Sequence, residues 1–129
     1  MEASTTAILA FNLLCTGNLT ASGFGIDDTP KPYSSEYRID IESGQWCESE
    51  CKTIFAIASV QPTQITLEET SKISPTGGEE SLKNFVNRET GEHRVFSLSG
   101  RKYQRFSITW KGQCERKPFT GFPKFETKF

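Results

Sequence analysis

The feature that most constrains the fold of this chain is the alternation of apolar and polar side chains in short runs. In residues 36–42, the apolar Tyr37, Ile39 and Ile41 alternate with charged residues. A period of two places each set on its own face of a β-strand. Clusters of Gly, Pro and Ser separate successive runs, as turns separate strands. The sequence therefore predicts a sheet with one buried face.

Six segments are predicted as strands, and we expect one β-rich domain over residues 24–129. Residues 52–60 are apolar on both faces, and residues 80–88 also fit a short helix, although a strand is preferred. The predicted strands are residues 36–42, 52–60, 64–69, 80–88, 92–98 and 102–111, with 71–80 as the clearest loop. Short turns between them favour an all-β antiparallel meander of about six strands. Such a meander curls into a small sandwich or barrel to cover its apolar face.

Residues 1–23 have most features of an export signal. They contain an apolar run at 7–14, the small residues Ala21-Ser22-Gly23, and neither Lys nor Arg, although Glu2 stands where a positive charge is usual. The run is shorter than the roughly 20 apolar residues that a membrane-spanning helix needs. We predict an exported, periplasmic or secreted protein, with an ordinary N-terminal strand or short helix as the alternative. Lipid attachment at Cys15 is disfavoured because Leu14 precedes it.

Removal of residues 1–23 would leave three cysteines, Cys47, Cys51 and Cys114. In an oxidising compartment we expect one disulfide, with a lean to Cys47–Cys51, and one free thiol. A bond from Cys114 would close a longer loop and stabilise more. One alternative is a zinc site, in which the same three cysteines and His93 would form a Cys3His ligand set. Another is a catalytic pair, in which one cysteine would lie beside His93. We expect neither a metal nor a cofactor.

Charge is divided between the two halves of the chain. Residues 24–80 hold 4 basic and 11 acidic residues, and residues 81–129 hold 11 basic and 4 acidic ones. We expect the halves to neutralise each other across one sheet, and the alternative is a basic face for an anionic partner.

Aromatic residues supply the candidate binding positions. Trp46, Tyr103 and Trp110 are expected to line a pocket if the sheet encloses one. Phe119 and Phe122 flank a glycine in the tail Pro118-Phe119-Thr120-Gly121-Phe122-Pro123. The prolines exclude a central strand there. The tail is expected to plug an end or edge of the sheet as core, or else to anchor a partner.

No catalytic constellation is evident, so a non-enzymatic binding or envelope-associated domain is the leading functional hypothesis. Its partner is unknown, and a protein or a small apolar ligand would fit. The alternatives are a ligand-binding β-barrel and a hydrolase using the carboxylates Asp40, Glu42, Glu68 and Glu69. Nucleic-acid binding is the least favoured, and would use Arg94, Phe96, Arg101, Lys102, Tyr103, Arg105 and Phe106.

Two motifs carry a resemblance to known proteins. They are Trp46-Cys47-x3-Cys51 and a Gly112-x-Cys114-x3-Pro-Phe-Thr-Gly-Phe-Pro tail. With Tyr37-Arg38-Ile39-Asp40, Ile65-Thr66-Leu67 and Asn87-Arg88-x-Thr90-Gly91, the chain resembles a group of small uncharacterised exported proteins of Gram-negative bacteria. The resemblance covers most of residues 24–129 and implies a periplasmic or envelope setting. It implies no activity, substrate or catalytic residue.

Overall fold

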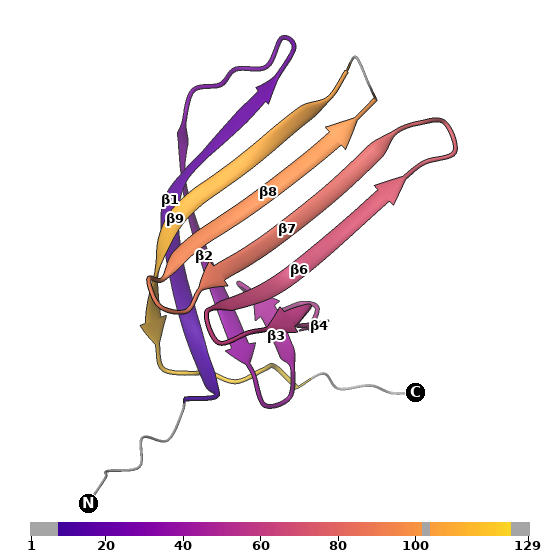
Figure 1. The fold of residues 1–129 in the computed structure, drawn as a ribbon. Helices are drawn as coiled ribbons and strands as arrows, with labels where there is room; N and C mark the ends of the chain where they lie inside the picture. Colours follow the sequence, from indigo (N-terminus) through magenta and orange to yellow (C-terminus); the bar gives the residue numbers. More distant parts are fainter. Residues whose placement is uncertain (1–7, 102–103, 125–129) are drawn as a thin grey trace, which may run out of the picture.

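The computed structural model describes residues 8–101 and 104–124, which form one antiparallel sheet curled into a half-barrel (Figure 1). The all-β prediction is confirmed, but the described residues form nine strands where about six were predicted. The strands are β1 (Ala10–Gly23), β2 (Lys31–Asp40), β3 (Gln45–Glu48), β4 (Phe55–Ala56), β5 (Ser59–Val60), β6 (Gln64–Ile73), β7 (Glu79–Asn87), β8 (Glu92–Gly100) and β9 (Phe106–Lys117).

The order of strands across the sheet is β4-β3-β2-β1-β9-β8-β7-β6-β5. Every pair of neighbours is also adjacent in the chain, except β1 and β9. The fold is therefore a meander whose first and last strands pair side by side in the middle of the sheet (Figure 1). This single long-range pairing joins the two halves of the chain.

β1 is built from residues that the sequence pattern assigned to an export signal. Ala10–Leu19 pair with β2, and Asn12–Gly23 pair with β9. Phe11, Leu13 and Cys15 face the core, which gives this apolar run a structural role. In the fold, these residues therefore form an ordinary N-terminal strand, which was the alternative to an export signal. Cleavage of a signal stays a prediction, but cleavage after Gly23 would remove the strand between β2 and β9.

One end of the half-barrel is bridged by residues 55–60. β4 pairs with β3, and β5 pairs with β6. Between them, the Ile57 amide donates to the Gly44 carbonyl at 2.8 Å, while the Ala58 amide donates to the Leu67 carbonyl at 3.3 Å. The chain therefore crosses from one edge of the sheet to the other, and we call this end the bridged end. The predicted strand over residues 52–60 is wrong, since two strands of two exposed residues replace it.

The opposite end is open and is formed by three long hairpins, β1–β2, β6–β7 and β8–β9 (Figure 1). β3 reaches β2 only from Tyr37 to Asp40, and β5 reaches β6 only at Ile65 and Thr66. The outer stretches of β2 and β6 are thus sheet edges, and Pro32 lies on one of them. The predicted loop 71–80 shortens to residues 74–78, because β6 and β7 extend into it.

The core lies inside the bridged half of the barrel and follows the predicted alternation. Its buried members come from β1, β2, β3, β6 and β7: Leu13, Cys15, Tyr37, Ile39, Trp46, Ile65, Leu67 and Val86. Val95 of β8 is also buried. A β-bulge between Thr66 and Glu68 shifts the register of β6 against β7.

Two disulfides join the four cysteines. Cys47–Cys51 confirms the preferred pair, and Cys114 bonds to Cys15 directly opposite it on β1. The prediction of one free thiol was wrong, because Cys15 belongs to the sheet. Two disulfides fit an oxidising, exported location.

The C-terminal tail crosses the outer face of β1 and β2. The Asn12 side chain exchanges two hydrogen bonds with Thr120, and the Arg38 guanidinium donates to the Gly121 carbonyl at 3.0 Å. Asn12 and Arg38 alternate with core residues, so both point outward. The rings of Phe119 and Phe122 are half-buried, 5.4 Å apart, and outside the core. The predicted plug was therefore wrong in its placement.

The oppositely charged halves meet across the sheet at two ion pairs. Lys83 pairs with Glu69 at 3.9 Å, and Arg105 pairs with Glu79 at 2.9 Å. Each joins a basic residue of the second half to an acidic residue of the first. The expected neutralisation therefore occurs at these positions, although exposed pairs of this kind contribute little stability.

The two disulfides predict unequal losses of stability. Cys15–Cys114 spans 99 residues and Cys47–Cys51 spans 4. The chain-entropy model assigns about 4.7 kcal/mol to the longer loop and about 2 kcal/mol to the shorter one. Denaturant unfolding of Cys15→Ser/Cys114→Ser and of Cys47→Ser/Cys51→Ser, each against wild type, measures this. A larger loss for the Cys47–Cys51 pair would contradict the account.

Candidate functional site

A column of aromatic rings runs through the interior and connects the two tryptophans. Trp110 stacks on Tyr33 with centroids 4.8 Å apart, Tyr33 contacts His93 at 5.7 Å, and His93 contacts Tyr37 at 5.4 Å. Tyr37 then meets Trp46 at 5.9 Å. Trp46 also contacts Phe55 at 5.0 Å and lines a hollow of about 220 Å³ with it. Trp110 is not part of that lining, so the two tryptophans do not share this hollow. Tyr103, the third predicted member, lies outside the described residues.

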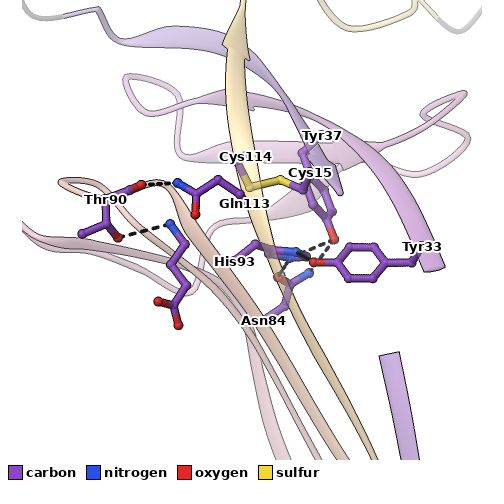
Figure 2. Close-up of a disulfide and its surroundings, with 9 residues drawn as sticks. Cys15, Tyr33, Tyr37, Asn84, Thr90, His93, Gln113 and Cys114 are labelled. Carbon is purple, nitrogen blue, oxygen red and sulfur yellow. Dashed lines mark hydrogen bonds between the residues drawn. A yellow bond between two sulfur atoms is a disulfide. The ribbon is translucent and has the colours of Figure 1, made fainter. Parts of the chain in front are cut away.

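His93 lies at the centre of this column and is fully buried (Figure 2). Its Nδ1 lies 2.9 Å from the Tyr33 hydroxyl, and its Nε2 lies 2.9 Å from Asn84 Oδ1. Because an amide oxygen only accepts, Nε2 carries the proton and Tyr33 donates to Nδ1. Asn84 Nδ2 donates to the Tyr37 hydroxyl at 3.2 Å. Each buried side-chain nitrogen and oxygen atom of the cluster thus has a hydrogen-bond partner.

Burial keeps this cluster uncharged. Desolvation lowers the pKa of His93 to about 4, so the ring is neutral at physiological pH. Burial also raises the pKa values of Tyr33 and Tyr37, so both hydroxyls stay protonated. A neutral imidazole held by three uncharged partners specifies packing and offers no exposed base. Its role in this fold is structural.

The cluster depends on a glycine pair between β1 and β9. Gly17 lies opposite Gly112, which also pairs with His93 on β8. A Cβ at Gly112 would lie 2.2 Å from the Tyr33 hydroxyl and 2.3 Å from the Thr16 carbonyl oxygen. The absent side chain therefore lets Tyr33 reach across β9 to the histidine.

The Cys15–Cys114 disulfide lies beside His93 (Figure 2), with the two sulfurs and an imidazole nitrogen within 4.8 Å of one another. Both sulfurs are committed to the disulfide. Cys47 and Cys51 are bonded to each other elsewhere on the sheet. The four residues of the zinc alternative therefore do not converge, and the thiol of the catalytic alternative is absent from this oxidised form.

A cavity of about 480 Å³ opens at the bridged end. Its apolar lining comprises Ile8, Phe11, Leu13, Ile65, Val86 and Cys114, and its polar lining comprises Asn87, Arg88, Gly91 and Arg116. Its floor is the hydrophobic core itself. Cavities of about 300–1,000 Å³ with apolar walls and a few polar groups are typical of small-molecule sites.

Two arginines lie at the mouth of this cavity. Arg116 faces Leu13 across the β1–β9 pair, so it continues the inward row of β9. Arg88 follows the inward Val86 by two residues, and its amide donates to the Thr63 carbonyl at 2.8 Å, which extends the β7 direction. Both side chains are exposed. The cavity therefore combines apolar side chains of the core with a basic rim, and its exposed lining is mixed in polarity.

Other hollows offer less. One of about 590 Å³ lies among the hairpin ends, around Lys72, Gly78 and Arg101. Another of about 430 Å³ lies on the inner face of β6, β7 and β8, where Glu68, Lys72 and Glu80 mix both charges around Phe106. Neither has the combination of a core floor and a single-sign rim. A third hollow has both, with Trp46 and Leu67 beside the acidic Glu68 and Glu69, but its volume of about 220 Å³ is below the range typical of small-molecule sites. The cavity at the bridged end is therefore the candidate site.

The carboxylates proposed for hydrolysis do not form a pair. Glu68 pairs in register with the buried Asn84 and Glu69 with Lys83, so the two neighbours point to opposite faces of β6. Asp40 accepts a hydrogen bond from the Ser43 amide in the turn that follows β2, and Glu42 is exposed in the same turn.

The residues proposed for nucleic-acid binding are divided between the two faces. Arg94 and Phe96 lie on the outer face of β8, where Arg94 pairs with Glu92. Phe106 lies on the inner face, and Arg105 pairs with Glu79. Arg101 is exposed in the β8–β9 turn, whereas Lys102 and Tyr103 lie outside the described residues.

No family model, no curated protein and no solved structure matches this chain. Among the residues that the structure describes, no helix is long and apolar enough to cross a membrane.

The buried histidine predicts a specific loss of stability in acid. His93 binds a proton less readily in the folded state, with a pKa of about 4, than at the ordinary histidine value of 6.5. Its contribution is therefore complete above pH 6.5 and is lost as pH falls towards 4. The loss should be about 3 kcal/mol.

Denaturant unfolding at a series of pH values, for wild type and His93→Gln, measures this contribution. His93→Gln should be less stable at neutral pH but should show a flatter dependence between pH 6.5 and 4. Parallel curves for the two proteins would show that His93 is not the group responsible.

Proposed function

We propose that this protein is an exported, non-enzymatic domain that binds a small, largely apolar ligand in the cavity at the bridged end. The observation that carries the proposal is a cavity whose floor is formed by core residues and remains open to solvent. Burial of apolar ligand surface there would be favoured at about 25 cal/mol per Å². A periplasmic or secreted setting is part of the same proposal.

The surrounding structure supports a preformed site. The cavity wall includes Cys114, which is fixed to β1 by a disulfide, and Phe11 and Leu13 of the same strand. The opposite wall contains Ile65 and Val86, which pair with each other across β6 and β7. Cross-linked and paired strands lose little further conformational entropy when a ligand binds. A binding role also agrees with the structural, uncharged environment of His93.

Binding of an uncharged apolar fluorophore tests the proposal. N-phenylnaphthylamine should bind with one site per protein and gain fluorescence, since it exchanges water for an apolar wall. Val86→Trp, which fills the cavity, should weaken binding at least about tenfold, the cost of about 1.4 kcal/mol.

Phe96→Trp is the matched control, because Phe96 is 45% exposed on the outer face. It should leave binding unchanged, and circular dichroism should show both variants folded. If Val86→Trp fails to fold, the narrower Val86→Phe serves the same purpose. Equal binding by wild type and the folded filling variant would place the fluorophore elsewhere.

A further inference from the structure

We propose that the ligand of this cavity is an amphipathic anion, an acyl chain with a negatively charged head group bound by Arg88 and Arg116. This inference rests on the proposed function and adds the chemical class of the ligand. The apolar residues of the lining suit the chain, and the two guanidinium groups at the mouth suit the head group.

The charge of the rim is of one sign. No acidic residue lines the cavity among the described residues, whereas two arginines do. Of the acidic residues next to this lining in the sequence, Glu92 pairs with Arg94 and Glu115 pairs with Lys117 at 3.2 Å, whereas Glu89, exposed beside Arg88, is in none of the five ion pairs of the described residues. Within the described ranges, none of the five ion pairs includes Arg88 or Arg116. The rim therefore carries positive charge that an anion would neutralise.

The two arginines approach the mouth from different strands. Arg116 comes from β9, opposite Leu13, and Arg88 comes from the end of β7. The Arg88 Nη1 group donates to the Gln61 carbonyl at 2.9 Å, which holds that guanidinium in place and leaves its other donors to a ligand. A carboxylate or phosphate at the mouth has acceptors for donors from both sides, while its chain extends towards Phe11 and Val86.

Exposure of both arginines is consistent with this arrangement. A head group at the rim stays in contact with water, so the charges are not desolvated at the high cost of a buried ion pair. The expected gain from charge is therefore moderate, about tenfold in affinity. It should also decrease as salt screens the exposed charges.

Ligands with the same chain and different head groups test the proposal, by displacement of N-phenylnaphthylamine at pH 8 and below their micellar concentrations. Dodecanoate or dodecyl phosphate should bind about tenfold more tightly than dodecanol. Dodecylammonium should bind more weakly than dodecanol. The tighter of the two anions identifies the head-group chemistry, carboxylate or phosphate.

Substitutions of the two arginines test whether they cause the preference for an anionic head group. Arg116→Gln should reduce the affinity for the anions to that for dodecanol and leave dodecanol unchanged, while Arg116→Lys should retain most of the difference. Arg88→Gln should act in the same direction, with unfolding measured because Arg88 also contacts Gln61. Lys111→Gln removes one exposed positive charge from the outer face of β9, where Lys111 is in none of the five ion pairs, and should change nothing.

The outcomes separate the two proposals. Failure of all four ligands and of the fluorophore to bind would overturn the proposed function. Binding of dodecanol as tightly as both anions, or an unchanged anion preference in Arg116→Gln and in Arg88→Gln, would overturn only the assignment of an anionic head group.

Discussion

The pairing of β1 with β9 is the interaction on which the rest of the structure depends. All other strand pairs join neighbours in the chain, so they form locally, whereas this pair brings residue 15 against residue 114. It closes the longest loop in the fold and therefore carries the largest entropic cost of any strand pair. The disulfide between Cys15 and Cys114 offsets part of that cost. Both the His93 cluster and the candidate cavity have walls that only this pairing creates.

The interior on either side of that pairing combines two kinds of stabilisation. Towards the bridged end it is apolar, and the cavity lies against this part. At the level of Gly112 it becomes polar, where Tyr33, Asn84 and His93 satisfy one another. An unmatched polar group in this position would cost about 1–3 kcal/mol, so the cluster tolerates few substitutions. The cluster forms only when β2, β7, β8 and β9 keep their present registers. It thereby helps to specify the curl of the sheet.

Much of the fold could be predicted from periodicity, because alternation in residues 36–42 reports directly on burial, although in residues 92–98 the buried His93 and the exposed Phe96 do not follow it. The prediction failed where the local sequence fits two different structures. The apolar run that contains Leu13 also suits an export signal, and only its pairing with β9 shows its place in the sheet. Because Cys15 was assigned to the export signal, it was not considered as the disulfide partner of Cys114. Residues 52–60 look apolar enough for a buried strand but bridge two edges instead. No local motif marks Arg88 and Arg116 as site residues. Both continue the inward-facing rows of predicted strands, so the two-residue period of those strands could have placed them at the cavity.

The most direct test of this account is a non-reducing peptide map of the native protein, purified from the compartment in which it accumulates. A peptide containing Cys15 should be joined to a peptide containing Cys114, a second bond should join Cys47 and Cys51, and no thiol should be free. This result would place Ala10–Gly23 in the mature domain. A native protein that begins at or after Phe24, with Cys114 as a free thiol, would contradict the central role of β1 and require a different centre for the sheet.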